Sequence, residues 1–143
     1  MAERGGRLLG LDLGERRIGV ALGDPTGFLA SAHEVLQSRG RVRDVEAVRQ
    51  IADREGVDAV VVGVPLNMDG SRGPQAEKSH RFGAALEAAG LPVVYWDERL
   101  TSVEAQRYLR RGGMSRQKRR EAIDAAAAAI LLQSYLDYRR NRA

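Results

Sequence analysis

The stretch LLGLDLG, residues 8–14, places one carboxylate inside an otherwise apolar run near the start of a 143-residue chain. If the run is a strand, its side chains alternate, so the leucines at 9, 11 and 13 point to one face while Gly10, Asp12 and Gly14 point to the other. A buried carboxylate is costly unless a cation, a donor or a metal lies beside it. Because glycines flank Asp12 on its own face, a metal ion or a phosphate backbone has room to approach. The simpler interpretation is an aspartate that ends an edge strand at a turn.

The rest of the chain alternates strand and helix patterns. Short apolar runs bounded by turn residues predict strands, and apolar residues at helical spacing predict helices. The expected strands cover residues 8–14, 18–22, 28–36, 57–64 and 92–96. The expected helices cover residues 43–55, 74–89, 101–111 and 120–138.

This order predicts an α/β fold with a mixed sheet. Three consecutive strands with short connections indicate an antiparallel meander. The valine-rich run at 57–64 is typical of a strand covered on both faces. Helical crossovers then add parallel strands, giving a five-stranded sheet flanked by helices. We expect residues 1–143 to form a single domain, which is long enough to bury a core without disulfides.

Composition narrows the class of protein. The chain has no cysteine, which excludes disulfides and thiolate metal sites and fits a reducing cytoplasm. Its first residues are polar and charged, and no apolar run approaches the length of a membrane span. We therefore expect a soluble, cytoplasmic protein with no membrane partner.

Positive charge is concentrated in one segment. Residues 99–123 contain eight Lys or Arg and two Glu, a local charge of +6 on a chain whose net charge is +4, so the remainder carries −2. Such a concentration is typical of a surface that binds a phosphate backbone, although a solvated helix face would have the same composition.

Two acidic residues follow the last expected strand. Asp97 and Glu98 lie at its carboxyl end, the edge at which open α/β sheets bind ligands. In an extended chain they point to opposite sides, so only one of them can join Asp12. We expect Glu98 to do so, with Asp97 as the alternative.

A third carboxylate lies on the last helix. Asp124 shares a stripe with Ala128, Leu131 and Tyr135, so it lies on the face that packs against the sheet, and the alanines at 125–129 allow a close approach. A rotated helix would instead point it to Arg120 or to water. If the three carboxylates converge, a divalent cation would relieve their repulsion. Oxygen ligands favour Mg²⁺ or Mn²⁺, and such a site suits phosphodiester hydrolysis.

Four stretches together resemble the YqgF family, also called RuvX. They are GLDLG with RIGVA (10–14 and 17–21), GVPLNMDG (63–70), DERLTS (97–102), and IDAAAA with ILLQSYL (123–128 and 130–136). The resemblance runs in order over nearly the whole chain, and DERLT is its most specific part. It implies a ribonuclease-H-like fold related to the resolvase RuvC, with Asp12, Glu98 and Asp124 as catalytic metal ligands. Family members are described as Holliday junction resolvases and as nucleases that mature the 5′ end of 16S rRNA.

The sequence therefore predicts a metal-dependent endonuclease that acts on structured nucleic acid, either branched DNA or precursor rRNA. Two-fold symmetry would suit an enzyme that cuts two strands, so a homodimer is one expectation. The residues expected to contact nucleic acid are Arg17, Arg110, Arg111, Arg116, Lys118, Arg119 and Arg120. Arg99 could contact phosphate or pair with Asp97 or Glu98 and hold the strand end in place, and we expect the second role.

Two alternatives stay open. A non-catalytic adaptor could keep the same fold and basic surface, but it would have little need for inward carboxylates. An ATPase of the actin and Hsp70 type also begins with a Gly-x-Asp-x-Gly strand. Against the ATPase, Glu15-Arg16-Arg17 replaces the hydroxyl residues of those phosphate loops, and there is no Walker-type glycine loop.

Overall fold

The computed structural model describes residues 6–100 and 116–142, with side chains at 6–99 and 121–142. Within these residues five strands form one sheet in the order β3-β2-β1-β4-β5. The strands are β1 Arg7–Leu13, β2 Arg17–Gly23, β3 Ala30–Gln37, β4 Val57–Val64 and β5 Val93–Asp97. The first three pair antiparallel, while β4 pairs parallel with β1 and β5 parallel with β4. The expected mixed α/β sheet is confirmed.

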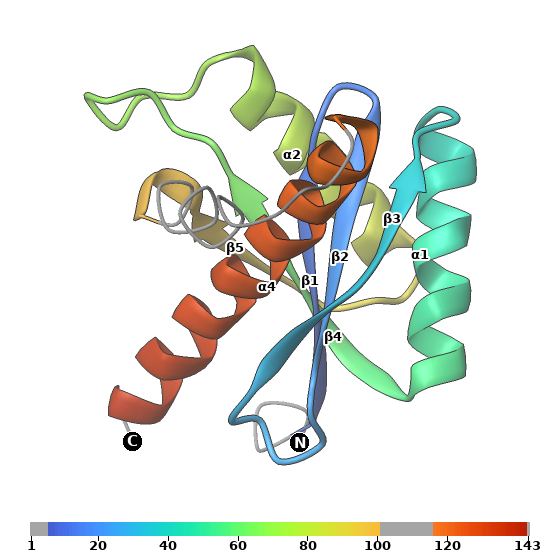
Figure 1. Cartoon of the computed structure of the whole chain (residues 1–143), viewed down its shortest axis with the longest axis vertical. Coiled ribbons are helices and arrows are strands. Elements are labelled where there is room, and N and C mark those ends of the chain that lie inside the picture. The colour runs from blue at the N-terminus through green and yellow to red at the C-terminus, as the bar shows by residue number, and fades with distance from the viewer. Residues whose placement is uncertain (1–5, 101–115, 143) are drawn as a thin grey trace.

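Helices cover both faces of this sheet. They are α1 Arg41–Glu55, α2 Pro74–Ala88 and α4 Arg116–Arg142, and a short 3-10 turn, η1 Glu98–Leu100, follows β5. Figure 1 shows α4 crossing the front of the sheet, with α1 and α2 on the other side. The central strand β1 is therefore covered on both faces.

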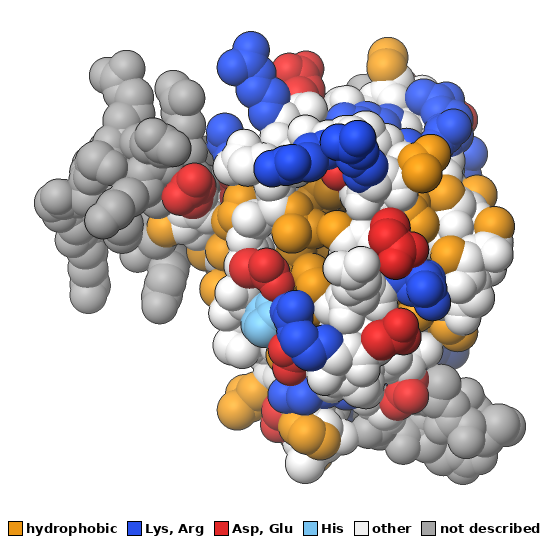
Figure 2. Space-filling view, turned by 90° about the vertical axis from the view of Figure 1, so that its right-hand side faces the viewer, with side chains coloured by type: hydrophobic (Ala, Val, Ile, Leu, Met, Phe, Trp, Pro, Cys, Tyr) orange, Lys and Arg blue, Asp and Glu red, His pale blue; other side chains and the backbone are white. Residues whose placement is uncertain are grey.

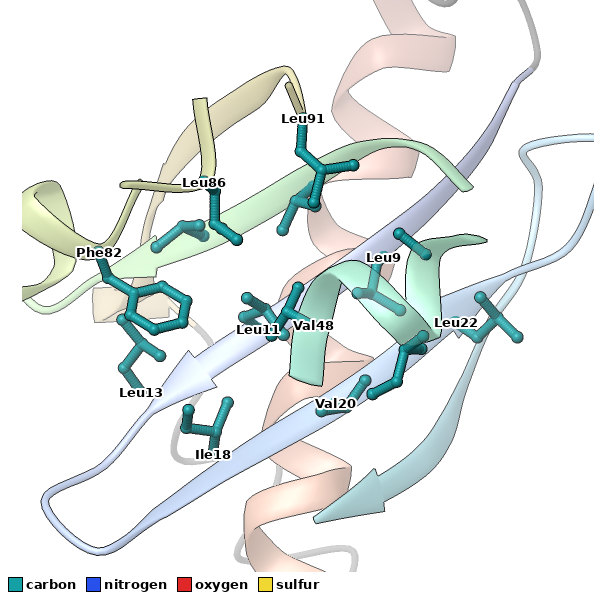
Figure 3. Packing of buried hydrophobic residues seen from close by; sticks show 14 residues of the cluster. Leu9, Leu11, Leu13, Ile18, Val20, Leu22, Val48, Phe82, Leu86 and Leu91 are labelled. Carbon is teal, nitrogen blue, oxygen red and sulfur yellow. The ribbon is translucent and has the colours of Figure 1, made fainter. Parts of the chain in front are cut away.

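The alternation along β1 separates two apolar clusters. Leu9, Leu11 and Leu13 pack under α1 and α2 against residues such as Phe82, as Figure 3 shows. Leu8 instead belongs to the cluster beneath α4, which includes Leu132. Asp12, between Leu11 and Leu13, consequently lies on the α4 face of the sheet.

The observed elements differ from the sequence predictions mainly at their ends. The strand over 57–64 has the predicted bounds, and α1 begins at Arg41, two residues before the predicted start. The basic residues 116–119, expected to be a link before the last helix, are the first residues of α4, since Arg, Gln and Lys favour helix. The helix predicted at 101–111 lies outside the described residues.

Gly19 on β2 brings α4 onto the sheet. A Cβ built at Gly19 would collide with the backbone carbonyl oxygen of Asp124, and a backbone atom cannot swing aside as a side-chain end can. The helix therefore approaches the sheet at the turn that carries Asp124, which only glycine permits here.

We expect Gly19→Ala to lower the free energy of unfolding by about 2 kcal/mol, because the added methyl must push α4 away from β2. Thermal unfolding of the purified variant measures this. Gly73→Ala is the matched control, since its Cβ would meet only the Asn67 side chain, at 3.3 Å. Equal stability of Gly19→Ala and the control would contradict the close approach.

No helix in the described part of the chain is both long enough and apolar enough to span a bilayer.

Candidate active site

Asp12 lies in a cradle of glycines on the α4 face. Gly10 precedes it on β1, Gly19 is its register partner on β2, and Gly63 on β4 lies one residue beyond the Leu11–Val62 pair. A Cβ at Gly10 would lie 2.8 Å from Cβ of Leu132. The glycines thus let α4 approach the sheet around the Asp12 carboxylate.

Glu98 reaches Asp12 over Gly63. A Cβ at Gly63 would come within 2.7 Å of Cγ and 2.8 Å of Cδ of Glu98, so glycine is needed for the Glu98 side chain to lie across β4. Glu98 and Asp12 are hydrogen-bonded to each other, although the two residues come from the central strand and the η1 turn. The structure thus brings together the two carboxylates that the sequence paired.

This carboxyl pair holds a proton. Burial, the hydrogen bond to Asp12 and the negative charges of Asp12 and Asp97 raise the pKa of Glu98 to about 10. Burial also raises the pKa of Asp12, and the charge of Asp124 raises it further, against the lowering effect of the hydrogen bond from Glu98. At neutral pH, therefore, one proton is shared where two negative charges would otherwise repel each other.

Asp124 lies near this pair but is bound to Arg17. Arg17 Nε donates to Asp124 Oδ2 at 2.6 Å, and the two side chains are 27% and 26% exposed. The Asp124 charge acts on Asp12, so the helix face predicted to carry this carboxylate inward does carry it toward the site. The sequence analysis assigned Arg17 to nucleic acid and did not anticipate this ion pair.

Asp97, the alternative to Glu98, is engaged elsewhere. Arg99 donates to Asp97 Oδ2 from Nε at 2.9 Å and from Nη2 at 2.7 Å, and its backbone N–H donates to Oδ1 at 2.9 Å. The Arg99 guanidinium lowers the pKa of Asp97. Nη1 of Arg99 also lies within 3.4 Å of the carbonyl oxygen of Asn67. Arg99 thus clamps the end of β5, the structural role expected for it.

The donor set fits a hard divalent cation. Asp12 and Glu98 supply only oxygen, and a cation placed between them would replace the shared proton as the charge that offsets their repulsion. Among the described residues, no group of three His, Cys, Asp or Glu side chains is gathered as a metal site. Asp124 would be the third ligand, and its carboxylate is paired with Arg17.

We expect Arg17→Gln to bind Mn²⁺ about tenfold more tightly than the wild type, because the variant removes a cation that competes for Asp124. The same change should lower the stability of the metal-free protein by no more than about 1 kcal/mol, since the ion pair is partly solvated. Calorimetric titration with Mn²⁺ and thermal unfolding in EDTA measure the two effects.

Arg16→Gln is the matched control, since it removes the same charge from the exposed neighbouring position. If the Mn²⁺ affinity of Arg17→Gln equalled that of Arg16→Gln, the competition between Arg17 and a metal would be disproved.

The predicted nucleic-acid contacts beyond Arg17 fall between residues 110 and 120 of the sequence. Arg110 and Arg111 are outside the described residues. Arg116, Lys118, Arg119 and Arg120 lie on the helical backbone at the start of α4, and their side chains are not among those described. Their contact with phosphate stays a prediction.

Sequence analysis missed two parts of the site. Gly19 on β2 and Gly63 on β4 flank Asp12 on the two neighbouring strands. Each is a single glycine within a run of apolar residues. A lone glycine inside a strand pattern signals a close backbone approach, so this signal was available. The Arg17–Asp124 pair had no local signal, because the two residues are 107 positions apart.

Comparisons with known proteins agree with this arrangement. The family model described as "RuvX: Holliday junction resolvase" matches residues 6–138. A relative from Geobacillus thermodenitrificans is 50% identical over 138 residues, covering 94% of this chain and 99% of its own. Another, from Caldanaerobacter subterraneus subsp. tengcongensis, is 48% identical over 137 residues with the same coverage. Both carry the name "Putative pre-16S rRNA nuclease".

Solved structures share the fold at low sequence identity. RuvC from T. thermophilus, in complex with a Holliday junction substrate, matches with a TM-score of 0.62 and 18% identity, covering 96% of this chain and 98% of its own. The Fowlpox virus resolvase in complex with Holliday junction DNA matches with a TM-score of 0.57 and 11% identity, covering 92% and 97%. The expected ribonuclease-H-like fold is confirmed.

Proposed function

The chain belongs to the RuvX Holliday junction resolvase family and is a nuclease, a hydrolase of phosphodiester bonds, and on this premise we propose that Asp12, Glu98 and Asp124 form its metal-dependent catalytic centre. The observation that carries the proposal is the hydrogen-bonded contact between the Asp12 and Glu98 carboxyl groups, with the Glu98 side chain lying over Gly63. Two carboxylates that lie together despite their mutual repulsion are typical of a cation site. A purely structural contact would gain no stability from the second negative charge.

Each residue of the centre has a distinct task. Asp12 and Glu98 would hold Mg²⁺ or Mn²⁺ with carboxylate oxygens, and Asp124 would complete the ligand set once Arg17 releases it. A bound divalent cation would lower the pKa of an attacking water and offset the negative charge that develops on the phosphate. The glycine cradle around Asp12 is filled by α4 and by the Glu98 side chain, so it would bring the carboxylates together rather than leave the room for a phosphate backbone that the sequence predicts.

For the substrate, we propose structured RNA, with the 5′ end of precursor 16S rRNA as the first candidate. The relatives that carry the pre-16S rRNA nuclease name align with nearly the whole chain. The second candidate is a four-way DNA junction, which the description of the matched family favours. In either case the basic residues near the start of α4, Arg116, Lys118, Arg119 and Arg120, would hold the backbone beside the centre.

One experiment tests both candidates. The protein is incubated with precursor 16S rRNA and with a four-way DNA junction, each with Mn²⁺ or with EDTA, and the products are mapped. We expect Mn²⁺-dependent cuts at defined positions in the RNA and little cleavage of the junction. If the protein cleaves the junction in preference to the RNA, and sediments as a dimer when bound to the junction, the substrate would be the second candidate, the four-way DNA junction.

The same experiment separates the enzyme from its rivals. Binding of both substrates with no Mn²⁺-dependent cleavage of either would contradict the proposal and favour an adaptor. Turnover of ATP by the purified protein in a parallel assay would favour an ATPase.

A further inference from the structure

A pocket of about 320 Å³ opens on the face of the sheet opposite Asp12. It lies beyond the end of β1, between the start of α1 and the first half of α2. On the face shown in Figure 2, apolar atoms form a hollow with Lys and Arg side chains above it and Asp or Glu side chains at its sides. Its volume falls at the lower end of the range for small-ligand pockets, about 300–1,000 Å³.

The floor of the pocket is apolar and rigid. Leu13 and Ile18 are register partners on β1 and β2, and both are buried in the cluster that also contains Phe82. Figure 3 shows these three side chains together at one end of the cluster. They are held by the core beneath them, so the floor is preformed for a flat apolar group.

The rim of the pocket is positive. Arg41, Lys78 and Arg81 contribute three charges against one from Asp44. The Asp44 carboxylate is already occupied, since it accepts from Ser38 Oγ at 2.6 Å and from the Arg39 backbone N–H at 2.8 Å. The rim therefore offers cationic donors to an incoming anion, while its one acid is used to fix the loop before α1.

The start of α1 adds to this field. Its N-cap is Gly40, which supplies no side chain, so no side-chain oxygen caps the first N–H groups, and Asp44 is the acidic residue in the first turn. Lys78 is fixed at the same place, because its Nζ donates to the carbonyl oxygen of Gly14 at 3.0 Å.

From these features we propose that the pocket binds a phosphorylated nucleoside, with the phosphate on Arg41, Lys78 and Arg81 and the base against Leu13, Ile18 and Phe82. The combination selects this class of ligand, because inorganic phosphate would leave the apolar floor empty and an apolar ligand would leave the cationic rim unpaired. The ligand is either a free mononucleotide or one nucleotide of a bound strand. Gly14 lines the pocket two residues after Asp12, so the pocket and the candidate active site lie near the same end of β1 but on opposite faces of the sheet.

The test uses the whole protein in EDTA, so that no cleavage occurs. Titration with 5′-AMP, followed by ¹H–¹⁵N NMR, should shift the amides of Gly14, Gly40 and Arg41, and inorganic phosphate should bind at least about tenfold more weakly. Arg41→Ala/Arg81→Ala should weaken 5′-AMP binding by about tenfold or more, the cost of losing charge-assisted hydrogen bonds.

The matched control is Arg43→Ala/Arg72→Ala, which removes two charges from exposed positions that do not line the pocket. Equal affinities of the two double variants for 5′-AMP, or shifts confined to residues on the α4 face, would overturn the proposal. Equal binding of phosphate and 5′-AMP would also overturn it, since the apolar floor would then make no contribution.

A second arm identifies the source of the nucleotide. If the pocket takes a nucleotide of a bound strand, Arg41→Ala/Arg81→Ala should also weaken binding of a single-stranded oligonucleotide and reduce its dependence on salt. If it takes a free mononucleotide, oligonucleotide affinity should match that of the control. Because binding is measured without metal, an inactive protein that still binds 5′-AMP would contradict the proposed function and leave the pocket assignment intact.

Discussion

Asp12→Asn is expected to abolish cleavage, with a loss of about a thousandfold or more, while nucleic-acid binding is retained. A bound metal contributes several kcal/mol to a phosphoryl transition state, and each 1.36 kcal/mol corresponds to about tenfold in rate. Asparagine keeps the shape of the side chain but removes the charge that would hold the cation. Its amide oxygen can still accept the hydrogen bond from Glu98, so the fold around the cradle should persist.

Single-turnover cleavage in Mn²⁺ and equilibrium binding in EDTA measure the two properties of Asp12→Asn separately. Asp58→Asn is the matched control, because Asp58 is exposed near the start of β4 while the candidate site lies at the carboxyl end of the sheet. Cleavage by Asp12→Asn at the rate of this control would remove Asp12 from the mechanism. A large loss of thermal stability would instead show that the carboxylate is required for folding.

Glu98→Gln is expected to abolish cleavage as well, and at the same time to stabilise the metal-free protein. Glutamine resembles the protonated Glu98, because its amide can donate to Asp12 as the carboxyl proton does. In the wild type the pKa of Glu98 is raised from 4.5 to about 10 in the folded state, so the folded protein holds a proton that the unfolded chain has released. Between these two values, stability therefore falls as pH rises.

The variant should remove this dependence on pH. At about pH 8 in EDTA, we expect Glu98→Gln to be more stable than the wild type by at least about 1 kcal/mol, since pH 8 lies more than one unit above 4.5 and one pKa unit corresponds to about 1.36 kcal/mol. The melting temperature should rise by at least roughly 2 °C, and the difference should shrink toward acid pH.

Glu87→Gln, at an exposed position on α2, is the control for loss of one acidic charge. A stability difference that did not change with pH would show that Glu98 holds no extra proton in the folded state. Adding Mn²⁺ should raise the melting temperature of the wild type and have little effect on Glu98→Gln, because the variant lacks a metal ligand.

Much of the fold could be predicted because it depends on short-range patterns. Alternation along residues 8–14 places Leu9, Leu11 and Leu13 on one face and Asp12 on the other, and the structure agrees. The valine run at 57–64 predicted a strand covered on both faces, which β4 is. Element ends were less accurate: the basic residues at 116–119 continue α4, although their charge suggested a link.

The candidate site was predicted in part. Alternation at the end of a strand indicates only that one of Asp97 and Glu98 can join Asp12, and the structure brings Glu98 there from the first residue of the η1 turn. Placing Asp124 on the inward face required only helical periodicity. Neither argument could show that Asp124 is held by Arg17, since that contact depends on where α4 crosses β2.

The sequence by itself thus determined the order of the elements, the face on which each carboxylate lies and the family of the chain, because these follow from periods of two and 3.6 residues and from motifs read along the chain. Tertiary structure alone decided which distant residues meet. Its results are the hydrogen bond between Asp12 and Glu98, the Arg17–Asp124 ion pair, and the basic pocket between α1 and α2. These depend on the angle and depth at which helices pack on a twisted sheet. That geometry is set by many side chains acting together, and no local pattern encodes it.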